Sequence, residues 1–120
     1  MIFPMLLLLG AHPVQRDTMP GCTEVHTTVQ REECLRNKLA REDKLLTKEE
    51  SRVRASLTQP AAVAFDSAAK LWRVYRTQEC KAVYTGYSDG SIAGSEFAGC
   101  EIELTKARRS ALSRLYVAEK

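Results

Sequence analysis

The sequence predicts a small all-α protein: an antiparallel bundle of about three helices with one long glycine-rich loop and two disulfides. Three observations support this fold class. Apolar residues recur at helical spacing in three segments, no alternating strand pattern of useful length occurs, and four cysteines are spread over 120 residues. A chain of this length has room for one hydrophobic core, so we expect one folded domain.

The first helix is expected over residues 28–54, which contain no glycine or proline. Thr27 and Gln30 have the spacing of a capping box, in which the two side chains satisfy free amide groups of the first turn. Helical spacing places the apolar side chains on one stripe. They are Val29, Leu35, Leu39, Leu46 and Val53.

A second helix is expected over residues 60–80, because Pro60 suits a first helical turn and apolar residues follow at helical spacing. This spacing joins Phe65, Ala68, Ala69, Trp72, Tyr75 and Glu79. Trp72 is therefore predicted to be a core residue and not a ligand platform.

Residues 81–99 are expected to form the long loop, because four glycines interrupt them and Ser88-Asp89-Gly90-Ser91 has the composition of a turn. Helical spacing resumes after Cys100 and continues to the C-terminus. The apolar residues of this third helix are Ile102, Leu104, Ala111, Leu112 and Leu115.

The first eleven residues, MIFPMLLLLGA, have the apolar character and small final residues of a secretory signal peptide. We expect a leader at 1–11, a flexible segment at 12–21 and the folded domain at 22–120, with a periplasmic or secreted location. A disordered or packed apolar N-terminus is the alternative. The stretch is too short to span a membrane, which takes about 20 apolar residues, so no stable membrane insertion is expected after leader cleavage.

Four cysteines in a short exported chain indicate two disulfides, for which three pairings exist. We favour Cys22 with Cys34, because a helix that starts after Cys22 lets the chain fold back. Cys80 with Cys100 then joins the ends of the glycine-rich segment. No metal site is expected, since zinc ligands usually include a pair a few residues apart and these cysteines are at least twelve apart.

The formal net charge of +3 arises from charges of both signs spread along the chain, a pattern typical of a solvated surface and not of a nucleic-acid interface. The sequence contains no nucleophile elbow, phosphate-binding glycine loop or H-E-x-x-H motif. Acidic pairs such as Glu49-Glu50 lie among lysines and arginines, as on an ion-paired helix face. We therefore expect a binding protein without a cofactor and without enzymatic activity.

The predicted loop carries the candidate partner-binding residues, which offer aromatic area and hydrogen-bonding groups between two cysteines. They are Tyr84, Tyr87, Ser88, Asp89 and Ser91, with Glu96 and Phe97 nearby. An equally weighted alternative is that the aromatic residues only cover the helix ends. Arg76 and Arg108 are expected to have a structural role, holding the loop through its carbonyl groups or Asp89.

Several segments together resemble the lysozyme inhibitor LprI family of exported bacterial proteins. The strongest is Trp72-x-x-Tyr75-Arg76-x-x-x-Cys80, followed by Gly90-Ser91, Cys100 and Thr105-x-x-Arg108; Cys22, Thr27, Cys34, Asp43 and Leu46 precede it at similar distances. The chain departs from the family pattern at Thr47 and Glu50, where Asn and Tyr are usual.

This resemblance implies a helical fold, disulfides, export, no cofactor and a protein partner. Two functions follow as hypotheses. The first is inhibition of a muramidase by occupation of its cleft, and the second is a non-inhibitory structural or accessory role in the periplasm.

Overall fold

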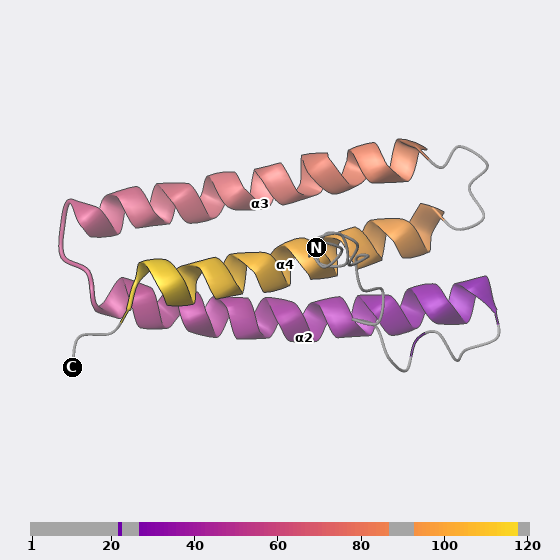
Figure 1. Cartoon of the computed structure of the whole chain (residues 1–120), viewed down its shortest axis with the longest axis horizontal. Coiled ribbons are helices and arrows are strands. Elements are labelled where there is room, and N and C mark those ends of the chain that lie inside the picture. Colours follow the sequence, from indigo (N-terminus) through magenta and orange to yellow (C-terminus); the bar gives the residue numbers. More distant parts are fainter. Residues whose placement is uncertain (1–21, 23–26, 87–92, 118–120) are drawn as a thin grey trace, which may run out of the picture.

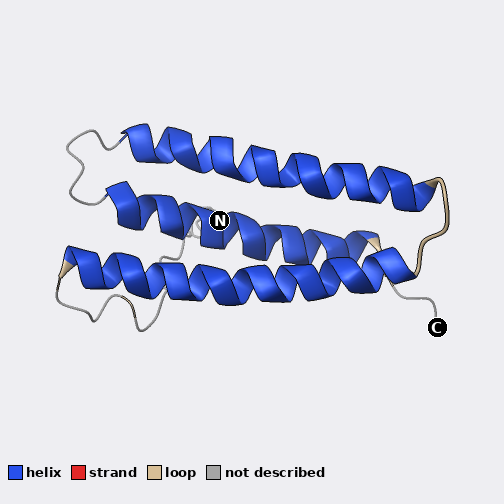
Figure 2. Ribbon diagram, turned by 180° about the vertical axis from the view of Figure 1, so that it is seen from behind, coloured by secondary structure: helices blue, strands red, loops and turns tan. Residues whose placement is uncertain are grey.

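The computed structural model describes residues 22, 27–86 and 93–117 (Figure 1). They form three helices, α2 (Thr28–Ala55), α3 (Ala61–Gly86) and α4 (Ala93–Leu115), and no strand occurs among them. Successive helices run antiparallel, and both views place α4 between the other two (Figures 1 and 2). The predicted all-α bundle is confirmed, whereas the expected leader and the segment 12–21 lie outside the described residues.

Helix α2 begins and ends where local chemistry favours it. The Thr27 hydroxyl accepts a hydrogen bond from the Gln30 amide at 3.0 Å, and the Gln30 side chain accepts one from the Thr27 amide, which completes the predicted capping box. At the other end, the Ser56 hydroxyl donates to the Val53 carbonyl at 2.7 Å. Arg52 and Arg54 lie in the last turn, where positive charge is favourable.

The predicted loop over residues 81–99 is wrong in its extent. Helix α3 continues to Gly86 and α4 already begins at Ala93. Gly94 and Gly99 therefore lie inside a helix, where glycine costs about 1 kcal/mol relative to alanine. Tertiary packing offsets this cost: Gly99 is buried, and Ala98 and Ile102 on the same helix belong to the core.

The core consists of two apolar clusters along α4. One contains Cys22, Leu35, Ala98 and Ile102, with Cys34 and Leu39 against it. The other contains Leu46, Val53, Phe65 and Leu112, with Leu57, Trp72 and Tyr116 against it. Both clusters include residues of α2 and α4, whereas α3 supplies Phe65 and Trp72 to the second alone.

Most of the predicted stripe residues are buried or partly buried, but five are exposed. They are Val29 in the first turn of α2, Ala68, Tyr75 and Glu79 on α3, and Leu115 at the end of α4. These predictions fail because helical spacing alone does not show which side of a helix its neighbours will cover. Trp72 does contact the core, as predicted, although it remains partly accessible.

Leu46 and Leu45 provide a matched test of this core. Leu46 is fully buried in the second cluster, so Leu46→Ala should lower the free energy of unfolding by about 3 kcal/mol through lost burial and a residual cavity. Leu45 is 43% exposed, and Leu45→Ala should cost less than about 1 kcal/mol. Urea denaturation of both variants checks the difference, and equal losses would contradict the assigned core.

Candidate functional site

Two disulfides cross-link the chain at the end of the bundle where α3 leads into α4. Cys80 of α3 is bonded to Cys100 of α4, with 5.6 Å between their Cα atoms. Cys22 is bonded to Cys34 of α2, and this bridge packs against Ala98 and Ile102. The favoured pairing is therefore confirmed, and the described cysteines are all paired.

An aromatic pair lies one turn beyond the Cys80–Cys100 bridge. The rings of Tyr84 on α3 and Phe97 on α4 meet edge to face, with 6.0 Å between their centroids. Tyr84 is 48% exposed, whereas Phe97 is less accessible. Tyr84 thus covers part of the helix end and also presents area to solvent, and its role in partner binding stays a prediction. We call Cys80, Tyr84, Phe97 and Cys100 the α3–α4 tip.

The other predicted partner-binding residues follow directly after this tip. Tyr87, Ser88, Asp89 and Ser91 lie outside the described residues, so their assignment stays a prediction. The neighbouring candidate Glu96 falls in the first turn of α4, where an acidic side chain is favourable.

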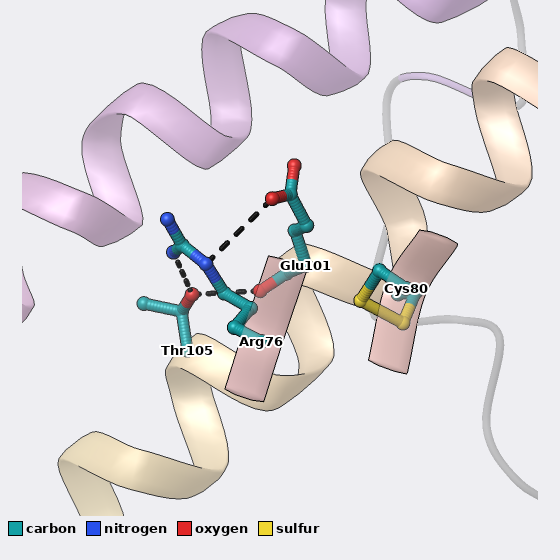
Figure 3. The surroundings of a disulfide bond; sticks show 5 residues. Arg76, Cys80, Glu101 and Thr105 are labelled. Atoms are coloured by element: carbon teal, nitrogen blue, oxygen red, sulfur yellow. Dashed lines mark hydrogen bonds and ion pairs between the residues drawn. A yellow bond between two sulfur atoms is a disulfide. The ribbon is translucent and has the colours of Figure 1, made fainter. Parts of the chain in front are cut away.

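Arg76 connects all three helices one turn below the Cys80–Cys100 bridge. Its Nη1 donates to Asp43 Oδ1 of α2 at 2.8 Å and to Thr105 Oγ1 of α4 at 2.7 Å. Its Nε lies 3.7 Å from Glu101 Oε2, and the Thr105 hydroxyl donates to the Glu101 carbonyl at 2.7 Å (Figure 3). Arg76, Asp43, Glu101 and Thr105 form what we call the arginine node.

Trp72 lies beside this node under three guanidinium groups. The Cζ atoms of Arg76, Arg73 and Arg108 are 5.2, 5.9 and 5.9 Å from its ring centroid, within the range of cation–π attraction. These contacts place Arg76 and Arg108 inside the bundle. Their expected contacts with the loop carbonyl groups or Asp89 involve residues outside those described, so that expectation stays a prediction.

Five of the residues on which the family resemblance rests meet at this place. Asp43, Trp72, Arg76, Thr105 and Arg108 come from three helices, yet they form one connected set of contacts. Spacing within one helix does not reveal this grouping, because its members lie on different helices. The signal in the sequence is that all five belong to the motifs that resemble the family.

A further ion pair crosses from α2 to α3 where the family pattern is broken. Arg73 donates through both terminal nitrogens to Glu50, at 2.9 Å each. This hydrogen-bonded pairing raises the pKa of Arg73. Glu50 stands where the family usually has an aromatic residue. Its charge-assisted hydrogen bonds with Arg73 link the two outer helices.

Burial has an electrostatic consequence at Glu101. Removal from solvent raises the pKa of its carboxyl, Arg76 lowers it, and Asp43 raises it again. The upward shift means that the folded state binds a proton more tightly than the unfolded chain does. The contribution of Glu101 to stability is thus fully present below pH 4.5, the ordinary pKa, and is lost as the pH rises.

A shallow cavity of about 410 Å³ lies between α2 and α4. It is lined by Glu42, Lys106, Arg109, Ser110 and Ser113, and Arg109 Nη2 donates to Glu42 Oε1 at 2.9 Å. This lining is polar and internally paired. In the part of the chain that the structure describes, no group of three potential metal ligands occurs and no helix is long and apolar enough to cross a membrane.

Burial raises the pKa of Glu101, so its charged form destabilises the fold at neutral pH. Glu101→Gln should raise the free energy of unfolding at pH 7 relative to the unmodified protein, and the gain should shrink as the pH falls toward 4.5. Glu49→Gln provides a control of opposite sign, because a hydrogen bond from Arg52 lowers the pKa of Glu49. That variant should lose stability at neutral pH, with the deficit fading in acid. Denaturation curves between about pH 2 and pH 7, recorded at about unit steps, check both directions. The same pH dependence in both variants would refute the account.

Comparison with known proteins adds one result to this geometry. A family model described as lysozyme inhibitor LprI matches residues 20–112, which include both disulfides and the whole arginine node. No curated protein and no solved structure matches the chain. Because the match covers most of the sequence, the chain belongs to the lysozyme inhibitor LprI family.

Proposed function

We propose that this chain is an exported envelope protein that binds a lysozyme through the α3–α4 tip and the residues after it, and so blocks the substrate cleft. The family match over residues 20–112 is the observation that carries the proposal, because the family is described as inhibitory and not as enzymatic. A protein partner follows from this description, and the tip supplies a place for it.

The construction of the tip supports a binding role. A disulfide holds the two helices together one turn before Tyr84, and the edge-to-face contact with Phe97 orders the tyrosine ring. A side chain ordered in advance loses little entropy when it binds, and tyrosine is enriched among residues that dominate interface energies. The segment 87–92 continues from this ordered base, and its polar residues are suited to hydrogen bonding.

The two disulfides also support export. Disulfides persist in the periplasm and outside the cell, where thiols are not kept reduced. Residues 1–11 are the proposed leader, and cleavage after them leaves the mature chain in a compartment where lysozymes act on the cell wall. A periplasmic or secreted location is thus consistent with the chemistry of the folded domain.

Charge restricts the choice of target. The chain has a formal net charge of +3, so a strongly basic lysozyme would experience repulsion during encounter. A neutral or acidic muramidase is the better candidate. Association with an acidic target should accelerate at low ionic strength, because attraction between opposite net charges is screened by salt.

A cell-wall lysis assay with purified protein and several lysozymes tests the proposal. The unmodified protein should inhibit at least one of them. Replacing both Tyr87 and Asp89 by Ala should weaken inhibition by about 2 kcal/mol or more, roughly 30-fold, as expected for hot-spot residues. Tyr84→Ala should have a smaller effect of about 1 kcal/mol, since half of its ring already packs within the tip.

Leu115→Ala is the control, because this leucine is exposed at the opposite end of α4 from the tip. It should inhibit as well as the unmodified protein. Full inhibition by a correctly folded Tyr87/Asp89 double variant would move the contact away from the tip. No inhibition of any lysozyme would favour the accessory role in the periplasm.

A further inference from the structure

The acidic residues in the middle of α2 are turned toward the other two helices. Asp43 and Glu50 form ion pairs with arginines of α3, and Glu42 forms one with an arginine of α4. Glu49 accepts a hydrogen bond from Ser113 of α4 at 3.2 Å. The mixed charges that the sequence shows along α2 are therefore sorted by direction in the folded protein, with the acidic ones bound at the helix contacts.

The side of α2 that faces away from these contacts carries only basic charge. Each residue of a helix advances by about 100°, so the positions within about 60° of Arg41 form one side. Between residues 37 and 55 this side contains no aspartate or glutamate. Its uncharged positions include Leu45, which is 43% exposed. We call Lys38, Arg41, Lys44, Leu45, Lys48 and Arg52 the α2 basic face.

Three cations of the α2 basic face have no compensating charge. Arg41, Lys44 and Lys48 are exposed, and within the described part of the chain none of them forms an ion pair. Arg52 differs, because it already binds a carboxylate of α2. Glu33 is exposed as well, but it lies more than two turns before Arg41. The face therefore presents at least three free positive charges to a partner.

The composition of the face indicates which kind of partner fits it. Protein–protein interfaces are enriched in aromatic residues and depleted in lysine, whereas this face has three lysines and no aromatic residue. Clustered lysine and arginine are typical of segments that bind anionic lipids. We propose that the α2 basic face attaches the protein to an anionic phospholipid surface. This attachment does not depend on the proposed inhibition of a lysozyme.

The shape of the face suits a flat partner. Lys38 and Arg52 are about four turns apart, or roughly 21 Å along α2. The cations between them follow one side of a single helix, and α2 is an outer helix of the bundle (Figures 1 and 2). They can therefore reach one plane together. Lipid headgroups diffuse within a membrane, so each cation can recruit an anion without a fixed pattern in the partner.

The attachment is peripheral and chiefly electrostatic. Leu45 is the one large apolar side chain of the face, and it is accompanied only by the aliphatic stems of the lysines and arginines. Each lysine or arginine near an anionic membrane strengthens binding by about five-fold. The three free cations together thus account for roughly a 100-fold increase in affinity.

Co-sedimentation with lipid vesicles tests the proposal. At about 20 mM salt the purified, disulfide-bonded chain should bind vesicles that contain phosphatidylglycerol more tightly than vesicles of phosphatidylcholine alone. The difference should vanish at about 500 mM salt, where the screening length falls from roughly 20 to roughly 4 Å. Residues 1–11 are the same in every variant, and the phosphatidylcholine vesicles measure any binding by that apolar stretch.

The combined substitutions Arg41→Gln, Lys44→Gln and Lys48→Gln should weaken binding to the phosphatidylglycerol vesicles by about 100-fold at low salt. The matched control removes the same charge from exposed cations of the other two helices. It combines Lys70→Gln, Lys81→Gln and Arg114→Gln, and it should weaken binding by less than about five-fold. Circular dichroism should show unchanged helicity in both variants, because all six side chains are exposed.

Equal losses in the two triple variants would show that net charge alone attracts the protein, and they would overturn the proposal. So would equal binding to the two kinds of vesicle, or no binding to either at low salt. Binding to an acidic muramidase that depends on Arg41, Lys44 and Lys48, without binding to vesicles, would assign the α2 basic face to a protein partner instead.

Discussion

The hydrogen bonds of the Arg76 guanidinium group are the interaction on which the three-helix arrangement depends. The outer helices α2 and α3 make few contacts with each other, whereas α4 packs against both. Arg76 extends from α3 to Asp43 of α2 and to the buried Thr105 of α4, in the interval between the two apolar clusters. Buried polar groups are costly when unpaired, so this set of contacts favours one register of the helices over others.

The arginine node also explains what the family signature means physically. Asp43, Trp72, Arg76, Thr105 and Arg108 of the signature meet inside the bundle, whereas Tyr75 of the same signature is about half exposed. The buried part of the signature is therefore evidence for a shared helical frame. It does not by itself identify the partner of any one member.

The sequence by itself determined the helical class and the bounds of α2, and it favoured the observed cysteine pairing among three, because capping residues, helical spacing and short loop closures are local properties. It did not determine that α3 and α4 extend into the glycine-rich segment, since packing and a disulfide offset the low helix propensity of Gly94 and Gly99. Only the tertiary structure decided that Tyr75 faces solvent while Trp72 faces the core, and that Asp43, Arg76 and Thr105 meet. The physical reason is that each of these outcomes depends on where a neighbouring helix lies, and the spacing within one helix carries no information about its neighbour.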